Sequence, residues 1–189
     1  MKVIGIVGSP RKNGNTERLI TEALSVLESQ GLEVEMVKLG GLEIKPCDGC
    51  LACRQLKDCK IRDDFQQVYA KMVAADGIII GSPVYFAGPT PQVLSLLHRA
   101  GYLSMAQGRV FDRKVGGPIV VARRAGETTA FTQLLMFFLH QGMIVPGSTY
   151  WNVAFGRAPG EVENDKEGME TVRNFAANVA WTLGKLAKD

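Results

Sequence analysis

The most reactive side chains of this sequence are four cysteines that fall within residues 47–59. Two, two and five residues separate successive cysteines, on a segment that also carries Pro46 and Gly49. Four thiolates at such short spacings can reach one centre and ligate an iron–sulfur cluster or a tetrahedral zinc ion. They can equally remain reduced or redox-active thiols without a metal. The candidate ligands are Cys47, Cys50, Cys53 and Cys59.

A second group of polar residues, at positions 8–16, lies between an apolar run at 3–7 and a stretch of helical periodicity. The free N–H groups of a helix N-terminus attract anions, and glycine lets the backbone approach a ligand closely. The loop lacks the motifs of a P-loop and of a dinucleotide site, so it suits a single terminal phosphate. The alternative is a turn that binds nothing. The candidate phosphate ligands are Ser9, Arg11, Gly14, Asn15 and Thr16.

Strands and helices alternate along the whole chain, which is typical of a parallel sheet with helices on both faces. Apolar runs or alternating patterns predict strands at 3–7, 32–39, 78–80, 118–122 and 143–146. Helical periodicity predicts helices near 15–30, 65–73, 93–100, 128–141 and 169–186, with Thr128 or Thr129 as the cap of the fourth and Asp63 and Asp64 as caps of the second. A length of 189 residues with 46% hydrophobic content suits one domain, into which a cysteine-rich segment at about 40–62 is inserted.

Three loops follow apolar strands and should meet at one edge of the sheet: residues 8–16, 82–88 and 122–128. Ligands of such folds bind outside the carboxyl ends of the strands. The second loop offers Tyr85 and Phe86 for stacking on a flat ring, and Arg123 and Arg124 of the third can favour negative charge on a reduced ring. Together with the phosphate loop, they predict flavin mononucleotide (FMN). The alternative is aromatic residues that cap the core and arginines in a solvated loop.

These motifs, from Gly8 to Thr16 and from Gly81 to Phe86, resemble those of the NAD(P)H-dependent FMN reductase family, and the four-cysteine segment resembles its iron–sulfur flavoprotein branch. The resemblance implies a flavodoxin-like, doubly wound five-stranded parallel sheet of order 2-1-3-4-5 over residues 1–189. It implies a 4Fe-4S cluster on the cysteines, which exchanges electrons with the flavin. It also implies FMN contacts from Ser9, Arg11, Gly14, Asn15, Thr16, Pro83, Val84, Tyr85 and Phe86, with Ala122, Arg123, Arg124 and Gly126 in the third loop.

The expected function is an FMN-dependent oxidoreductase that carries electrons between a 4Fe-4S cluster and FMN. The alternatives are a cluster-free NAD(P)H-dependent FMN or quinone reductase and a flavin-binding redox-sensing protein. Electron partners are NAD(P)H, a quinone or a ferredoxin. Hydride transfer to flavin needs no acid or base from the protein, so no catalytic residue is assigned. His98 and His140 lie far apart in predicted helices and are assigned structural roles.

The net charge of +3 gives no reason to expect nucleic acid or a membrane as a partner. The sequence shows no signal peptide and no membrane-spanning stretch, which predicts a cytoplasmic protein whose cysteines stay reduced. The resemblance implies a homodimer or homotetramer. The helix that contains residues 131–139 is apolar over much of its circumference and is a candidate interface. The candidates for reaching a neighbouring subunit's flavin are Trp151, Phe155 and the loop at 156–160.

Overall fold

The computed structural model describes residues 1–187, which form one five-stranded sheet. The strand order is β2-β1-β3-β4-β5, and every pair of neighbours is parallel. This confirms the flavodoxin-like topology expected from the sequence. The strands are β1 (Lys2–Val7), β2 (Glu33–Lys38), β3 (Gly77–Pro83), β4 (Val115–Ala122) and β5 (Val153–Phe155).

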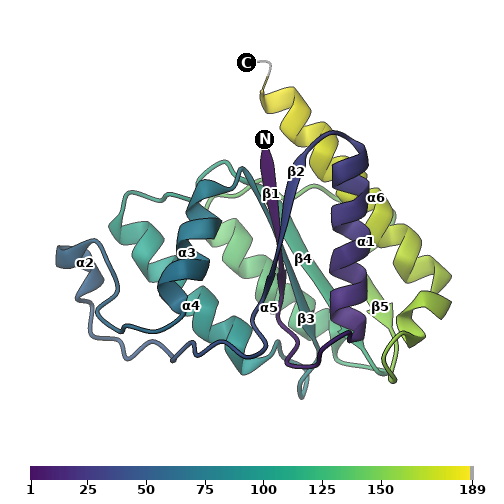
Figure 1. Cartoon of the computed structure of the whole chain (residues 1–189), viewed down its shortest axis with the longest axis horizontal. Coiled ribbons are helices and arrows are strands. Elements are labelled where there is room, and N and C mark those ends of the chain that lie inside the picture. Colours follow the sequence, from purple (N-terminus) through teal and green to yellow (C-terminus); the bar gives the residue numbers. More distant parts are fainter. Residues whose placement is uncertain (188–189) are drawn as a thin grey trace.

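Helices cover both faces of the sheet (Figure 1). On one face lie α1 (Asn15–Ser29) and α6 (Lys166–Leu186), and on the other lie α3 (Phe65–Ala74), α4 (Pro91–Ala106) and α5 (Glu127–His140). Two shorter elements complete the fold: α2 (Cys53–Leu56) within the cysteine segment, and the 3-10 helix η1 (Glu161–Asn164). In Figure 1, α2 projects from the edge of the molecule on the side of α3 and α4.

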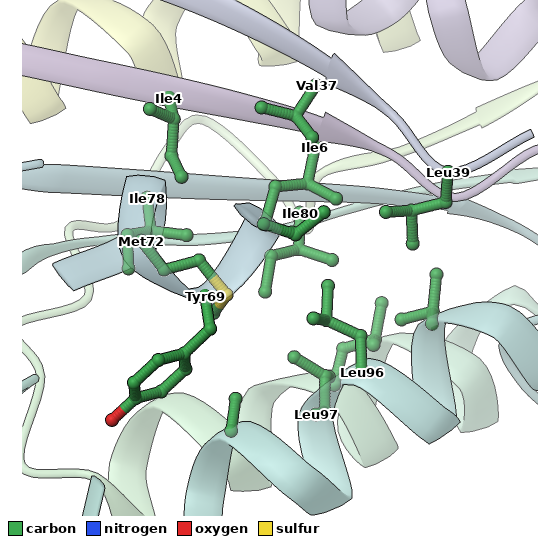
Figure 2. Close-up of a cluster of buried hydrophobic side chains, with 14 of the residues drawn as sticks. Ile4, Ile6, Val37, Leu39, Tyr69, Met72, Ile78, Ile80, Leu96 and Leu97 are labelled. Atoms are coloured by element: carbon green, nitrogen blue, oxygen red, sulfur yellow. The ribbon is translucent and has the colours of Figure 1, made fainter. Parts of the chain in front are cut away.

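Buried apolar side chains on both sides of the sheet hold these layers together. On β1, Ile4 and Ile6 face α3 and α4, whereas Val3 and Val7 face α1 and α6. Figure 2 shows the first of these clusters, in which isoleucines of β1 and β3 meet leucines of α4 such as Leu96. Burial of both faces explains why β1, β3 and β4 are continuous apolar runs in the sequence.

The fifth strand is not where the sequence predicted it, so the prediction of a strand at 143–146 is wrong. Ile144 forms only an isolated bridge with Val115, through bonds of its N–H to Lys114 and of its carbonyl to Gly116. The next bond of a parallel ladder would need an N–H at position 146, and Pro146 has none. The chain therefore leaves the sheet and returns as β5, which pairs with the end of β4.

Two predicted helix caps also differ from the structure. The helix α5 starts at Glu127, after Gly126 with a φ of 87°, so neither Thr128 nor Thr129 caps it. Asp64 is the residue that precedes α3, but its side chain makes no capping bond. The other predicted cap, Asp63, accepts instead from the N–H of Phe65, the first residue of α3, over 3.0 Å. Among residues 1–187, no helix is both long enough and apolar enough to cross a membrane.

Candidate functional site

A cleft of about 370 Å³ lies at the carboxyl ends of β1, β3 and β4. All three loops that the sequence placed at this edge contribute to its walls. A fourth segment, which follows β5, contributes as well. The lining residues are Ser9, Arg11, Gly14, Asn15, Thr16, Pro83, Val84, Tyr85, Val121, Arg123, Gly156, Arg157 and Pro159.

The first loop is held tightly against the sheet at Gly8. Its N–H donates to the Gly81 carbonyl over 2.8 Å, and its carbonyl accepts from the Thr90 hydroxyl over 2.7 Å. A Cβ at this position would lie 2.1 Å from a methyl carbon of Val93, so only glycine fits. The loop then leads directly into α1, whose first residues line the cleft. The unpaired N–H groups and positive dipole end of this helix make it suited to an anion.

The Thr16 hydroxyl is the observation that best fits a ligand in the cleft. The residue is 2% exposed, and within the described part of the chain its Oγ1 is buried without a hydrogen-bond partner. A buried hydroxyl is normally paired, so this one fits an acceptor that binds in the cleft. The Ser9 Oγ accepts from the Arg11 N–H over 3.2 Å, which leaves its own proton free to donate. These residues therefore fit a phosphate group.

Asn15 lines the cleft and also fixes one of its loops through its side chain. Its Nδ2 donates to the Ala158 carbonyl over 2.9 Å, and its Oδ1 accepts from the Gly160 N–H over 2.8 Å. The amide thus holds the loop at 156–160 against the start of α1. This loop lines the cleft of its own chain, through Gly156, Arg157 and Pro159. The sequence predicted this loop only as a candidate for reaching a neighbouring subunit's flavin, not as a wall of its own chain's cleft.

The second loop places some of its predicted ligands in the cleft and others outside it. Pro83, Val84 and Tyr85 line the cleft, but Phe86 is fully exposed and does not. Tyr85 and Gly88 exchange two backbone hydrogen bonds around a tight turn in which Phe86 has a φ of 47° and Ala87 a φ of 65°. This strained turn directs Phe86 away from the cleft walls.

The third loop contributes Arg123 and the preceding Val121 to the cleft. Ala122 is buried within β4, Arg124 is exposed outside the cleft, and Gly126 packs on the second loop. A Cβ at Gly126 would lie 3.0 Å from the Cα of Ala87, which shows how closely the two loops meet. With Arg11 and Arg157, Arg123 gives the cleft three guanidinium groups.

The four cysteines line a second pocket, together with Arg99 and Tyr102 of α4. All four are free thiols. Burial raises the pKa of the Cys53 thiol, and the charges of the other three cysteines raise it further, because the four groups lie close to one another. The Asp48 carboxylate accepts from the Cys50 thiol and N–H and pairs with Lys60, which lowers its pKa to about 2.

The described residues contain no group of three or more His, Cys, Asp or Glu side chains arranged to hold a single metal ion. Thiolates are the protein donors of iron–sulfur clusters. The four free thiols that line this pocket therefore fit the donor set of such a cluster.

Comparison with known proteins gives a consistent result. The model of the NADPH-dependent FMN reductase family matches residues 1–158. An iron–sulfur flavoprotein of Methanocaldococcus jannaschii is 43% identical over 195 residues, which cover all of both chains. An iron–sulfur flavoprotein of Methanosarcina thermophila is 35% identical and covers all of this chain and 98% of its own.

Solved structures share the fold at lower identity. RosB with a bound 8-demethyl-8-formylriboflavin-5'-phosphate is similar with a TM-score of 0.75 and 20% identity, over 100% of this chain and 81% of its own. A flavodoxin from the domain Archaea has a TM-score of 0.66 and 14% identity, over 97% of this chain and 99% of its own. With its family match over residues 1–158, its close relatives and its parallel sheet, this chain belongs to the NADPH-dependent FMN reductase family and is a flavin-dependent oxidoreductase of flavodoxin-like fold.

Proposed function

We propose that this chain is an iron–sulfur flavoprotein, which binds FMN in the cleft and a 4Fe-4S cluster in the cysteine pocket, and passes electrons between them. The observation that carries the proposal is the gathering of all four thiols around one pocket in a chain that also has a flavin cleft. The names of the similar archaeal proteins support it.

The flavin phosphate is assigned to the start of α1. There the Thr16 hydroxyl lacks an acceptor, the Ser9 hydroxyl has a free proton, and Arg11 supplies a positive charge. The ring is assigned to the wall formed by Pro83, Val84 and Tyr85. Bound FMN supplies the hydride and electron chemistry, and the Arg123 guanidinium in the same cleft favours the negative charge of the reduced form.

The cluster is assigned to Cys47, Cys50, Cys53 and Cys59. Ligation needs thiolates, so metal binding must displace the proton that burial and neighbouring charges keep on Cys53. A cluster transfers single electrons, whereas a flavin can take one or two. The pair of centres therefore suits a protein that exchanges electrons with a one-electron carrier such as a ferredoxin, as well as with a small two-electron partner.

A second candidate is a cluster-free reductase that uses NAD(P)H to reduce flavin, a quinone or another small acceptor. The family model, whose description names NADPH, favours it. The two candidates share the FMN cleft and differ in the cysteines. They also share the cytoplasm as the expected location.

We propose a homodimer or homotetramer for either candidate. The helix α5 turns Ala130, Leu134 and Phe138 inward but leaves Met136 and Leu139 about half exposed. The exposed part continues an apolar groove between α4 and α5. Sedimentation of the purified protein tests this assembly.

Separate loss of the two centres tests the assignment of the sites. We expect Cys53→Ala to lower the iron content of anaerobically purified protein and to leave its flavin content unchanged. We expect Thr16→Val to lower the flavin content and to leave the iron content unchanged. If Cys53→Ala left the iron content unchanged, the cysteine pocket would not be the metal site. If both variants lost both groups together, the change would reflect damage to the fold.

A further inference from the structure

A buried ion pair joins the cysteine segment to the core. The Arg99 and Asp63 side chains, 1% and 0% exposed, lie 2.7 Å apart. Arg99 belongs to α4, and Asp63 stands two residues before α3. The Arg99 guanidinium also stacks over the Phe65 ring, 4.1 Å from its centroid. Stability alone does not account for two charges so fully removed from water, because a buried ion pair stabilises a fold little more than apolar packing would.

The same guanidinium holds both ends of the cysteine segment. Nη1 donates to the Lys45 carbonyl over 3.2 Å, and Nη2 donates to the Ile61 carbonyl over 2.9 Å. These two residues flank the stretch from Cys47 to Cys59. The Asp63 carboxylate accepts from the Lys45 N–H over 2.8 Å, which fastens the first end a second time.

Arg99 also forms part of the wall of the cysteine pocket, whereas Asp63 does not. The positive end of the ion pair is thus the end that borders the cysteine pocket. Within residues 1–187 the Nε of Arg99 is buried and has no acceptor, so one donor of the guanidinium remains unused. A second attachment lies farther along the segment, where Lys57 donates to the Ala106 carbonyl over 2.6 Å and its own carbonyl accepts from Gln107 over 2.7 Å.

We propose that Arg99 is a positioning residue. By joining the two ends of the cysteine segment, it closes the segment and holds the four thiols near one another before the metal centre binds. The inference rests on the proposed cluster. Apart from α2, the segment has no regular structure, so its ordering must come from such fixed contacts. A planar guanidinium that bonds two carbonyls at once fixes their separation, which a single ammonium cannot do. A segment closed before the metal arrives loses less entropy on binding.

The first test is Arg99→Lys in the full chain, prepared without metal. Lysine keeps the positive charge beside Asp63 but cannot reproduce both carbonyl bonds. We expect the backbone amides of residues 47–59 to exchange with deuterium at least tenfold faster, while those of β1 and β3 and the bound FMN stay as in the wild type. Arg109→Lys is the control, because Arg109 also donates to a backbone carbonyl, that of His140, but does not line the pocket.

The second test is the double variant Arg99→Met with Asp63→Leu, which removes the pair without leaving a lone buried charge. We expect the same local increase in exchange. After anaerobic loading with iron and sulfide, we expect this variant to lose iron to a chelator at least threefold faster. We also expect its cluster to have a lower reduction potential than that of Arg99→Lys, because the positive charge that is removed lines the pocket, whereas the negative charge removed with it does not.

Unchanged exchange at residues 47–59 in both variants would overturn the proposal. An equal increase throughout the domain, or failure of both variants to fold, would also overturn it, because the pair would then support the whole core. Equal reduction potentials in the two variants would refute the effect of the charge. If the wild-type protein bound no iron, the cluster assignment would fail, and exchange in the metal-free protein would still decide whether Arg99 closes the segment.

Discussion

The Thr16→Val substitution should change flavin binding and stability in opposite directions. Valine has nearly the shape of threonine and lacks the hydroxyl, which is buried without a partner in residues 1–187. An unpaired buried hydroxyl carries a desolvation penalty of about 1–3 kcal/mol. We therefore expect the flavin-free variant to be as stable as the wild type or more stable, by up to that amount.

Binding of FMN should weaken for the same reason. A hydrogen bond to a charged phosphate contributes about 1.5–3 kcal/mol. Since about 1.4 kcal/mol corresponds to a factor of ten, the Kd for FMN should rise about 10- to 100-fold. Riboflavin lacks the phosphate, so its Kd should change by no more than about twofold, equivalent to less than about 0.5 kcal/mol.

Fluorescence titration of both flavins and urea unfolding of the flavin-free protein measure these effects. Ser104→Ala is the matched control, because the Ser104 hydroxyl is also buried without a partner in the described chain but lies on α4, outside the cleft. This variant should bind both flavins normally. Equal losses for FMN and riboflavin in Thr16→Val, or a destabilised flavin-free protein, would refute the phosphate assignment.

Three further predictions follow from single contacts. Asn15→Ala should lower the free energy of unfolding by about 1–3 kcal/mol and speed proteolysis within residues 156–160, because the amide that holds this loop is lost. A loop that resists proteolysis as well as in the wild type would contradict this prediction. Gly8→Ala places a Cβ 2.1 Å from a carbon of α4, so urea unfolding should show a loss of at least about 1–3 kcal/mol, and an unchanged midpoint would disprove the tight contact. Burial raises the pKa of Asp63, but hydrogen bonds from Arg99 and from backbone N–H groups outweigh it and hold the pKa below its usual value. The ionised Asp63 carboxylate therefore stabilises the fold above about pH 4, and this stabilisation is lost as the pH falls through the pKa of Asp63 in the folded protein. Asp63→Asn should be less stable than the wild type by roughly 3–5 kcal/mol at pH 7, and this difference in the free energy of unfolding should narrow below about pH 4. A difference that stays constant with pH would count against the ion pair.

Apolar runs made most of the sheet predictable. A strand buried on both faces, such as 78–80, has few alternatives, and the order of the strands followed from the resemblance to a known family. The three residues of β5 are too few to show a period, and no local pattern separates them from 143–146. What decides between the two segments is the missing N–H of Pro146, whose effect depends on the neighbouring strand.

The site was predictable where it depends on topology. Parallel strands bring the ends of β1, β3 and β4 to one edge, so Ser9, Pro83 and Arg123 line one cleft. Contacts between residues far apart in the chain left no pattern in the sequence from which they could be predicted. The bond from Asn15 to Ala158 spans 143 positions, and a buried Arg99 looks in sequence like any charged residue on a helix surface.

The most direct test of the proposed function is the iron, zinc and flavin content of wild-type protein purified without oxygen, since air can destroy an exposed cluster. We expect about four irons per flavin and no zinc, with the iron lost when a cysteine of the pocket is replaced. Flavin without iron or zinc would contradict the iron–sulfur assignment. It would make this chain a cluster-free reductase and return its cysteines to thiol chemistry.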